Sequence, residues 1–184
     1  MPRLTELAHA AVRRVLAVGE VAIDATAGNG HDTRLLAELV GPAGRVFAFD
    51  IQPEALACTA KELGDTSNVT LLARDHAEMR DAIPPELHGR IGAVMFNLGY
   101  LPGGDKSITT QPASTLKAIS SALELLRPGG VLTVIAYIGH PGGAKEAEAV
   151  AELLGAFLTR EEQAEESVSG APRLFVVHKR LAVG

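Results

Sequence analysis

Short apolar runs alternate with longer amphipathic segments along most of the chain. Runs rich in Val, Ile, Leu and Phe predict strands at residues 21–26, 45–50, 69–74, 91–97, 131–137 and 174–178. Apolar positions at helical spacing predict helices at residues 5–18, 32–40, 53–63, 112–126 and 144–157. Strands that alternate with helices in this way form βαβ units with right-handed crossovers. The pattern therefore predicts an α/β fold with a doubly wound, mostly parallel sheet.

The C-terminal end departs from this alternation. A polar, glutamate-rich stretch at residues 160–169 is followed by a Gly-Ala-Pro turn and the apolar run at residues 174–177. This order is typical of a β-hairpin, which would add an antiparallel strand and bring the sheet to seven strands. We interpret residues 1–184 as one domain, in which a helix within residues 1–19 precedes a Rossmann-like core at residues 20–184.

Composition narrows the class of protein. The chain is 47% hydrophobic and 21% charged, which is typical of a globular protein with a substantial core. No apolar run approaches the roughly 20 residues that span a bilayer, and the N-terminal segment lacks the apolar core of a signal peptide. We therefore expect a cytoplasmic protein that makes no membrane contact. The net charge of −5 argues against a protein that binds long nucleic acid through its overall charge, although binding through a small basic patch is still an alternative.

The chain contains a single cysteine, Cys58, which falls in a predicted helix. One cysteine excludes an internal disulfide and supplies no cysteine-based zinc site. We expect Cys58 to be a small buried residue and expect no bound metal.

A glycine-containing loop follows the first predicted strand. The strand leads through Asp24 into Gly28 and Gly30, and a helix begins near Asp32. Glycines let a ligand approach the backbone closely, and the helix N-terminus presents free N–H groups there. A dinucleotide would require a third glycine at Thr33, and its pyrophosphate would be repelled by Asp24. S-adenosylmethionine (SAM) carries an ammonium and a sulfonium and no phosphate, so the loop favours SAM; a plain tight turn is the alternative.

Two more acidic residues follow the next two predicted strands. Asp50 lies about 20 residues beyond the glycines, where a carboxylate can accept both ribose hydroxyls of an adenosine ligand. Asp75 could accept the adenine amino group, and either residue could instead cap a helix. The predicted cofactor-binding residues are Asp24, Thr26, Gly28, Asn29, Gly30, His31, Asp32, Thr33, Asp50, Gln52, Asp75, His76 and Asn97.

The loops after the fourth and fifth strands carry candidate catalytic residues. Asn97 and Tyr100 have the spacing of the Asn-Pro-Pro-Tyr loop of amino-group methyltransferases. An Asn oxygen can accept the hydrogens of an amine and orient its lone pair, and a Tyr ring can stack on a base. Tyr137 and His140 follow the fifth strand, where His140 could take the proton that a methylated amine releases. Structural roles in turns are the alternative for these residues.

Three segments, at residues 24–33, 96–106 and 137–143, resemble the bacterial ribosomal-RNA methylase family. Its characterised members are tRNA methyltransferases of the MnmM type, which convert 5-aminomethyl-2-thiouridine at wobble position 34 to 5-methylaminomethyl-2-thiouridine. The resemblance implies a class I SAM-dependent methyltransferase that forms a homodimer and acts on the anticodon stem-loop of tRNA. Lys106 and Arg74 could then contact the RNA backbone.

Other activities remain as alternatives at this point. Within the same fold, the acceptor could be ribosomal RNA or a small-molecule amine. A nicotinamide-dependent oxidoreductase or a methyltransferase-like binding module without catalysis would also suit a glycine loop of this kind.

Overall fold

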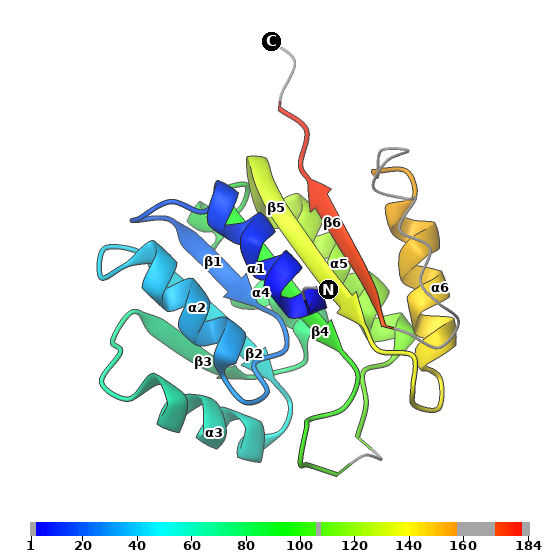
Figure 1. Ribbon diagram of the computed structural model, residues 1–184. Coiled ribbons are helices and arrows are strands. Elements are labelled where there is room, and N and C mark those ends of the chain that lie inside the picture. Colours follow the sequence, from blue (N-terminus) through cyan, green and yellow to red (C-terminus); the bar gives the residue numbers. More distant parts are fainter. Residues whose placement is uncertain (1–2, 106–107, 158–171, 182–184) are drawn as a thin grey trace.

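A twisted β-sheet forms the centre of the computed structural model, which describes residues 3–105, 108–157 and 172–181 (Figure 1). Within these residues the sheet has six strands in the order β3-β2-β1-β4-β5-β6. The strands are β1 (Val21–Asp24), β2 (Arg45–Asp50), β3 (Val69–Ala73), β4 (Ile91–Leu98), β5 (Leu126–Ala136) and β6 (Arg173–His178). Strands β1 to β5 are parallel and β6 is antiparallel to β5. The predicted doubly wound sheet with a C-terminal antiparallel strand is confirmed.

The strand order reverses beside β1, which pairs with β2 on one side and with β4 on the other. The connections after β1 and β4 therefore leave toward opposite faces and open a crevice at the carboxyl edge of the sheet. Asp24 ends β1, and Asn97 lies one residue before the end of β4. Both predicted site residues are therefore at the edge where ligands bind in folds of this kind.

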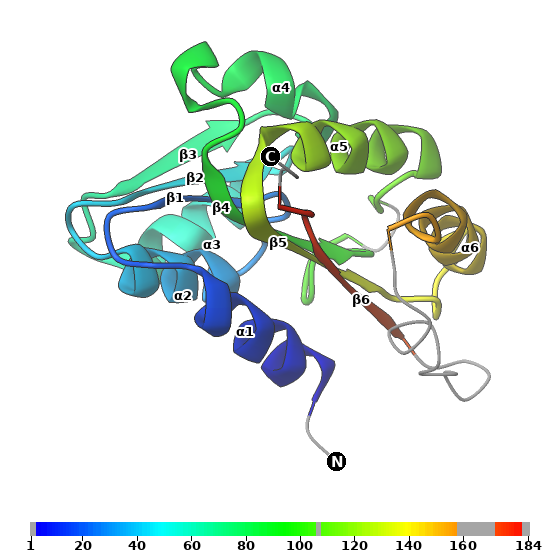
Figure 2. The same ribbon diagram turned by 90° about the horizontal axis from the view of Figure 1, so that it is seen from above.

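Helices cover both faces of the sheet (Figure 2). One face carries α1 (Leu4–Val15), α2 (His31–Val40) and α3 (Pro53–Leu63), and the other carries α4 (Met79–Ala82), α5 (Pro112–Leu125) and α6 (Gly143–Leu154). Two short 3₁₀ turns, η1 (His76–Glu78) and η2 (Pro85–Leu87), flank α4. Neighbouring residues of one strand face opposite layers: Ala22 packs in the core beneath α1 and α2, and Ile23 packs beneath α5 and α6.

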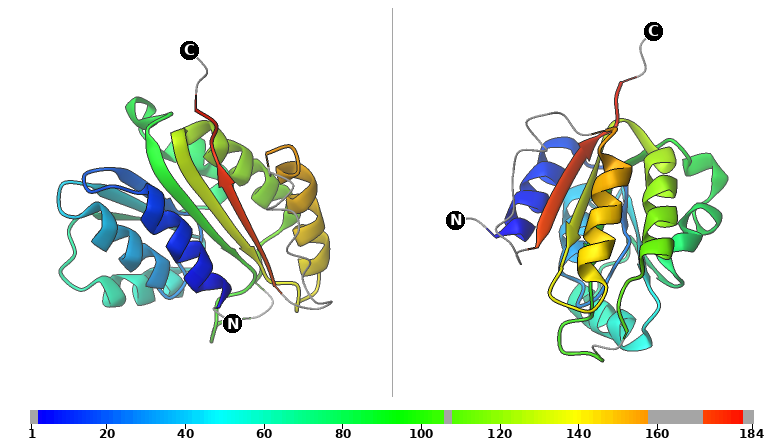
Figure 3. Two further views of the ribbon diagram at one scale, coloured as in Figure 1. Left: turned by 45° about the horizontal axis from the view of Figure 1, so that its top comes forward. Right: turned by 90° about the vertical axis from the view of Figure 1, so that its right-hand side faces the viewer.

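Helix α1 lies across β5 and β6 on the side of the sheet opposite α6 (Figure 3). Its buried face, which includes Ala8 and Val12, joins the same core as α2. The guanidinium of Arg127 donates to the Val15 carbonyl at 3.1 Å and to Glu20 Oε1 at 2.6 Å, which ties the end of α1 to β5. The helix ends at Val15, three residues before the predicted end, because Leu16 is extended and residues 18–19 form a turn.

Strand β5 begins five residues earlier than expected and includes the Arg-Pro-Gly-Gly segment that the sequence predicts as a loop. Gly129 N donates to Lys179 O at 2.8 Å, and Lys179 N donates to Gly130 O at 2.9 Å. These two bonds hold the segment beside the chain that follows β6. The predicted loop was therefore wrong, because pairing across the sheet outweighs the local preference of Pro and Gly for turns.

Cys58 is exposed on α3, so the predicted burial was wrong; Ala55 and Thr59 are the residues of α3 that face the core.

The expected seventh strand, at residues 160–169, lies outside the described residues. No helix within the described ranges is long and apolar enough to cross a membrane.

Candidate functional site

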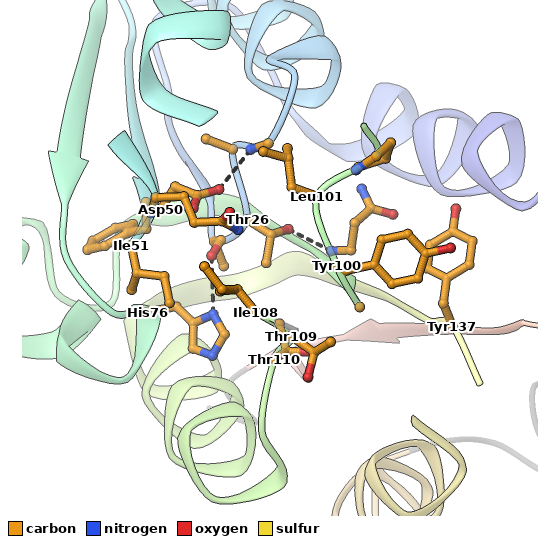
Figure 4. Close-up of a pocket in the computed structure, with 18 of the residues that line it drawn as sticks. Thr26, Asp50, Ile51, His76, Tyr100, Leu101, Ile108, Thr109, Thr110 and Tyr137 are labelled. Carbon is orange, nitrogen blue, oxygen red and sulfur yellow. Dashed lines mark hydrogen bonds between the residues drawn. The ribbon is translucent and has the colours of Figure 1, made fainter. Parts of the chain in front are cut away.

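A cleft of about 590 Å³ lies at the carboxyl edge of the sheet, where β1, β2 and β4 end (Figure 4). It brings together the loops after five strands, β1 to β5, which are far apart in the sequence. The predicted residues that line it are Thr26, Gly28, Asn29, His31, Asp32, Asp50, Gln52, Asp75, His76, Asn97, Tyr100, Tyr137 and His140. The cofactor-binding and catalytic sets predicted from the sequence therefore share one cavity.

Three of the predicted residues, Asp24, Gly30 and Thr33, do not line the cleft. Asp24 is fully buried beneath the glycine loop. Its carboxylate accepts hydrogen bonds from Thr26 N at 3.0 Å and from Thr33 Oγ1 at 2.6 Å. Asp24 and Thr33 therefore shape the loop from below, whereas the sequence reasoning placed Asp24 near the ligand.

The two glycines of the loop serve different purposes. A Cβ on Gly30 would lie 2.9 Å from Thr59 Cα, so its bare backbone lets α2 begin close against α3. A Cβ on Gly28 would make only ordinary van der Waals contacts, at 3.7 Å with Leu101 and the Thr26 carbonyl oxygen, and this residue lines the cleft. Both have positive φ, which glycine adopts without strain. Only Gly28 is positioned to admit a ligand.

Burial, together with the neighbouring carboxylate of Asp32, raises the pKa of Asp24 from 3.8 to about 7. The folded protein therefore holds a proton on Asp24 more tightly than the unfolded chain does. It follows that the contribution of Asp24 to the free energy of unfolding is present below about pH 4 and is lost as pH rises to about 7.

We predict that Asp24→Asn removes this pH dependence. Urea unfolding of the variant and the wild type at about pH 5 and about pH 8 measures the effect. The variant should gain stability relative to the wild type at the higher pH, because its amide never ionises. A difference in unfolding free energy that is the same at both pH values would contradict the prediction.

Asp50 and Asp75 approach the cleft with part of their carboxylates already bonded to backbone. Asp50 accepts from Gly28 N at 3.0 Å and from Gln52 N at 2.9 Å, so it joins the end of β2 to the glycine loop. Asp75 accepts from Ala77 N at 2.8 Å and caps η1, as one of the two interpretations predicted. Each carboxylate has lone pairs left for a ligand.

His76 lies under the same part of the cleft. Its Nδ1 is 3.3 Å from the carbonyl oxygen of Ala25, which can only accept, so Nδ1 carries the hydrogen. Burial lowers the pKa of His76, and the ring packs edge-on to Phe96. His76 therefore presents a neutral imidazole to the cleft.

Asn97 is held from two sides. Its backbone N–H donates to Thr26 Oγ1 at 2.7 Å, and its side-chain Nδ2 donates to a carboxylate oxygen of Asp32. The other oxygen of Asp32 accepts from His9 Nε2 at 2.6 Å. Among the described residues, no donor reaches the buried Oδ1 of Asn97. The sequence did not indicate His9, because its helix gives no local sign of contact with the glycine loop.

Another wall of the cleft is formed by Tyr100, Tyr137 and His140. Tyr100 and Tyr137 lie near each other at the cleft (Figure 4), and the rings of Tyr100 and His140 meet edge-on at 6.2 Å. His140 Nδ1 is 3.2 Å from the Pro141 carbonyl oxygen and must donate to it, which leaves Nε2 as an acceptor. Burial and the charge of Asp32 raise the pKa of Tyr137, so its phenol stays protonated near neutral pH.

The cleft also contains residues that the sequence did not single out. Ile51 and Ile108 are exposed apolar side chains at the cleft, and Thr5 reaches it from α1. Ile51 directly follows the predicted site residue Asp50, and this adjacency in the sequence could have indicated that Ile51 lines the cleft. Arg74, expected to contact RNA, lines the cleft, whereas Lys106 lies outside the described residues.

A buried glutamate anchors the loop that carries Tyr100. Glu146 on α6 accepts from Thr110 Oγ1 at 2.7 Å and from Thr115 Oγ1 at 2.6 Å. Thr110 N also donates to Gly99 O at 3.0 Å, which draws the two ends of the loop together. The loop after β4 is thus tied to both α5 and α6.

We predict that Glu146→Ala lowers the free energy of unfolding by about 2–4 kcal/mol, because two hydroxyls lose their acceptor in a buried place. Urea unfolding measures the change. Glu148→Ala, at an exposed position of the same helix, is the matched control and should change stability by less than about 0.5 kcal/mol. Equal effects of the two substitutions would show that the buried contacts carry no stability.

Comparison with known proteins identifies relatives of this chain. The family model "Putative rRNA methylase" matches residues 46–167. A tRNA (mnm⁵s²U34)-methyltransferase of Arabidopsis thaliana, named as chloroplastic, is 40% identical over 159 residues, which are 80% of this chain and 57% of that protein. The chain thus spans little more than half the length of this curated relative.

Two crystal structures match nearly the whole chain. A protein from Clostridium thermocellum, described as a "putative rRNA-methylase", is 39% identical with a TM-score of 0.87, covering 97% of this chain and 98% of the other. A protein from Streptococcus mutans, described as a "putative methyltransferase" and solved in complex with SAH, is 36% identical with a TM-score of 0.82, covering 97% of this chain and 99% of the other. Because these relatives are methyltransferases, the alternative of a nicotinamide-dependent oxidoreductase is excluded. The chain belongs to the "Putative rRNA methylase" family of SAM-dependent methyltransferases.

Proposed function

We propose that the protein methylates the primary amine of 5-aminomethyl-2-thiouridine at wobble position 34 of tRNA, forming 5-methylaminomethyl-2-thiouridine. The observation that carries this proposal is the 40% identity with the tRNA (mnm⁵s²U34)-methyltransferase of Arabidopsis thaliana over 80% of the chain. The chemistry of the cleft supports it, because the Asn97 amide and the His140 imidazole each have an acceptor atom with no donor among the described residues, which suits an amine substrate.

The residues of the cleft fit SAM. Gly28 lines the cleft without a Cβ that would narrow it, and Asp50 and Asp75 offer carboxylate lone pairs to ribose hydroxyls and an adenine amino group. Ile51 supplies an apolar surface beside them. When bound, SAM supplies an electrophilic methyl group whose transfer forms an N–C bond, breaks the S–C bond and leaves an extra proton on the amine nitrogen.

Asn97 is the residue that would orient the amine. Its Oδ1 is a buried acceptor that lacks a donor within the described part of the chain, and leaving such an atom unpaired is costly. An amine hydrogen donated to this oxygen would satisfy it and direct the nitrogen lone pair.

His140 is the residue that would receive the proton. Its Nδ1 hydrogen points to a carbonyl oxygen, so Nε2 holds the lone pair, and this atom accepts no hydrogen bond from any described residue. Tyr100, whose ring meets His140 edge-on, would stack on the uracil base. Tyr137 would close the wall with its neutral phenol.

RNA binding would use local contacts, since the chain is acidic overall. Arg74 at the cleft is suited to a phosphate of the anticodon loop.

We also propose that the protein is a homodimer in the cytoplasm. Light scattering during gel filtration measures the mass of the particle. A mass equal to that of one chain would contradict the dimer.

Purified protein, SAM and tRNA from cells that lack the modification test the function. Nucleoside mass spectrometry should detect 5-methylaminomethyl-2-thiouridine at the expense of the aminomethyl form. Ribosomal RNA and small-molecule amines, incubated in parallel with methyl-labelled SAM, test the alternative substrates. SAM binding without methylation of this tRNA would overturn the substrate assignment.

A further inference from the structure

A chain of hydrogen bonds runs from helix α1 to the cleft. His9 Nε2 donates to Asp32 Oδ1 at 2.6 Å, and Asn97 Nδ2 donates to Asp32 Oδ2. The three residues come from α1, α2 and β4, so only the folded chain brings them together. Asp32 and Asn97 line the cleft, whereas His9 lies behind them.

The carboxylate of Asp32 decides which way the Asn97 amide faces. An ionised carboxylate only accepts hydrogen bonds, so the amide must turn its NH₂ group toward Asp32. The flipped amide would place its oxygen against a carboxylate oxygen, where both atoms repel and neither has a hydrogen. The amide oxygen thereby faces away from Asp32 and, buried as it is, has no donor among the described residues.

Asp32 itself is held in place from α1 and α2. Its side chain is only 9% exposed, and it lies in the first turn of α2, where the helix dipole favours negative charge. The carboxylate of Asp32 in turn helps to raise the pKa of the buried Asp24. The N–H of His9 gives Oδ1 a donor, and α1 is fixed by the buried residues Ala8 and Val12 on either side of His9.

We propose that Asp32 and His9 are positioning residues, which hold the Asn97 amide with its oxygen toward the acceptor and so select a nucleophile that carries N–H hydrogens. This inference rests on the proposed amine methylation. It gives α1, which lies outside the alternating βαβ pattern, a part in the active site.

The test is a double-mutant cycle on tRNA methylation. Asp32→Asn should lower kcat by roughly 10- to 100-fold, because its amide can face Asn97 in either orientation. His9→Ala should lower kcat by roughly tenfold, and His9→Gln, which keeps an N–H donor, should recover part of that loss. The Kd for SAM should change less than about twofold in both His9 variants, since His9 does not line the cleft.

In the Asn97→Ala background, each of these substitutions should lower kcat further by less than about twofold, because the residue through which it acts is gone. If each substitution lowers kcat by the same factor in the Asn97→Ala background as in the wild type, the inference is overturned. Glu6→Gln, at an exposed position of α1, is the matched control and should leave kcat unchanged. Thermal unfolding of each variant separates lost activity from lost structure.

A second measurement distinguishes failure of this inference from failure of the proposed function. In ¹⁵N-labelled protein, the side-chain NH₂ signals of Asn97, identified by their loss in Asn97→Ala, should exchange slowly with solvent. Asp32→Ala should make their exchange fast. If the wild type does not methylate the tRNA, the proposed function falls and this signal still decides the orientation. Fast exchange in the wild type would overturn the inference, whatever the substrate.

Discussion

Asn97→Ala is expected to leave the Kd for SAM nearly unchanged while slowing methyl transfer by roughly 100- to 1,000-fold, as removal of one pre-positioned hydrogen-bonding group does in other enzymes. The reason lies in the geometry of Asn97. Its Nδ2 is engaged by Asp32, and its Oδ1 is buried without a donor among the residues described. The substitution deletes the acceptor for the amine and leaves the glycine loop in place.

Isothermal titration with SAM and single-turnover methylation of tRNA measure the two quantities separately. Ser120→Ala is a neutral control, because Ser120 is an exposed residue of α5 whose hydroxyl bonds only to the Leu116 carbonyl of the same helix among the interactions described. Equal losses in binding and in rate would place Asn97 at the cofactor and remove it from the role of orienting the amine.

Asp50→Ala is expected to weaken SAM binding by about 1.5–3 kcal/mol, which is roughly 10- to 150-fold in Kd. Two effects act in the same direction. The carboxylate would no longer be present for ribose hydroxyls, and Gly28 N would lose its acceptor at 3.0 Å. The loop that borders the cleft would then be ordered only when the ligand binds.

Asp50→Asn separates these two effects. Its single amide oxygen can still accept from Gly28 N, although Gln52 N then loses its acceptor, so the glycine loop should stay in place and most of the remaining loss of affinity reports on the ligand contact. Asp65→Ala, which removes an exposed carboxylate in the loop after α3, controls for the change in net charge. An unaltered Kd in Asp50→Ala would exclude Asp50 from the binding site.

Much of the fold could be predicted from the sequence because its strands and helices have strong local periodicity. The helix Pro53–Leu63 and the strand Arg45–Asp50 begin and end where the pattern predicts. The errors lie where contacts between distant segments outweigh local preference. The Arg-Pro-Gly-Gly segment of β5 is one example, because the chain after β6 pairs with it. The exposure of Cys58 is another, because a helix pattern alone does not say how far α3 is rotated toward solvent.

The candidate site divides in the same way. Asp50 and Asn97 could be found because parallel strands bring their carboxyl ends to one edge, so a residue's place in the strand predicts its place in the cleft. The different purposes of Gly28 and Gly30 could not be separated, because both lie in one loop and only the approach of α3 distinguishes them. Glu146 was also beyond prediction, since its acidic side chain lies in a helix pattern typical of a solvated surface.

The sequence by itself determined the alternation of strands and helices, the glycine loop and the polar residues at the strand ends, because these depend on periodicity and on residues adjacent along the chain. Only the tertiary structure decided that Asp24 lies beneath the loop, that Asp32 faces Asn97 and that His9 stands behind Asp32. Hydrogen bonds between side chains on different elements depend on helix rotation and on packing depth to within an ångström or so. No local pattern carries that information.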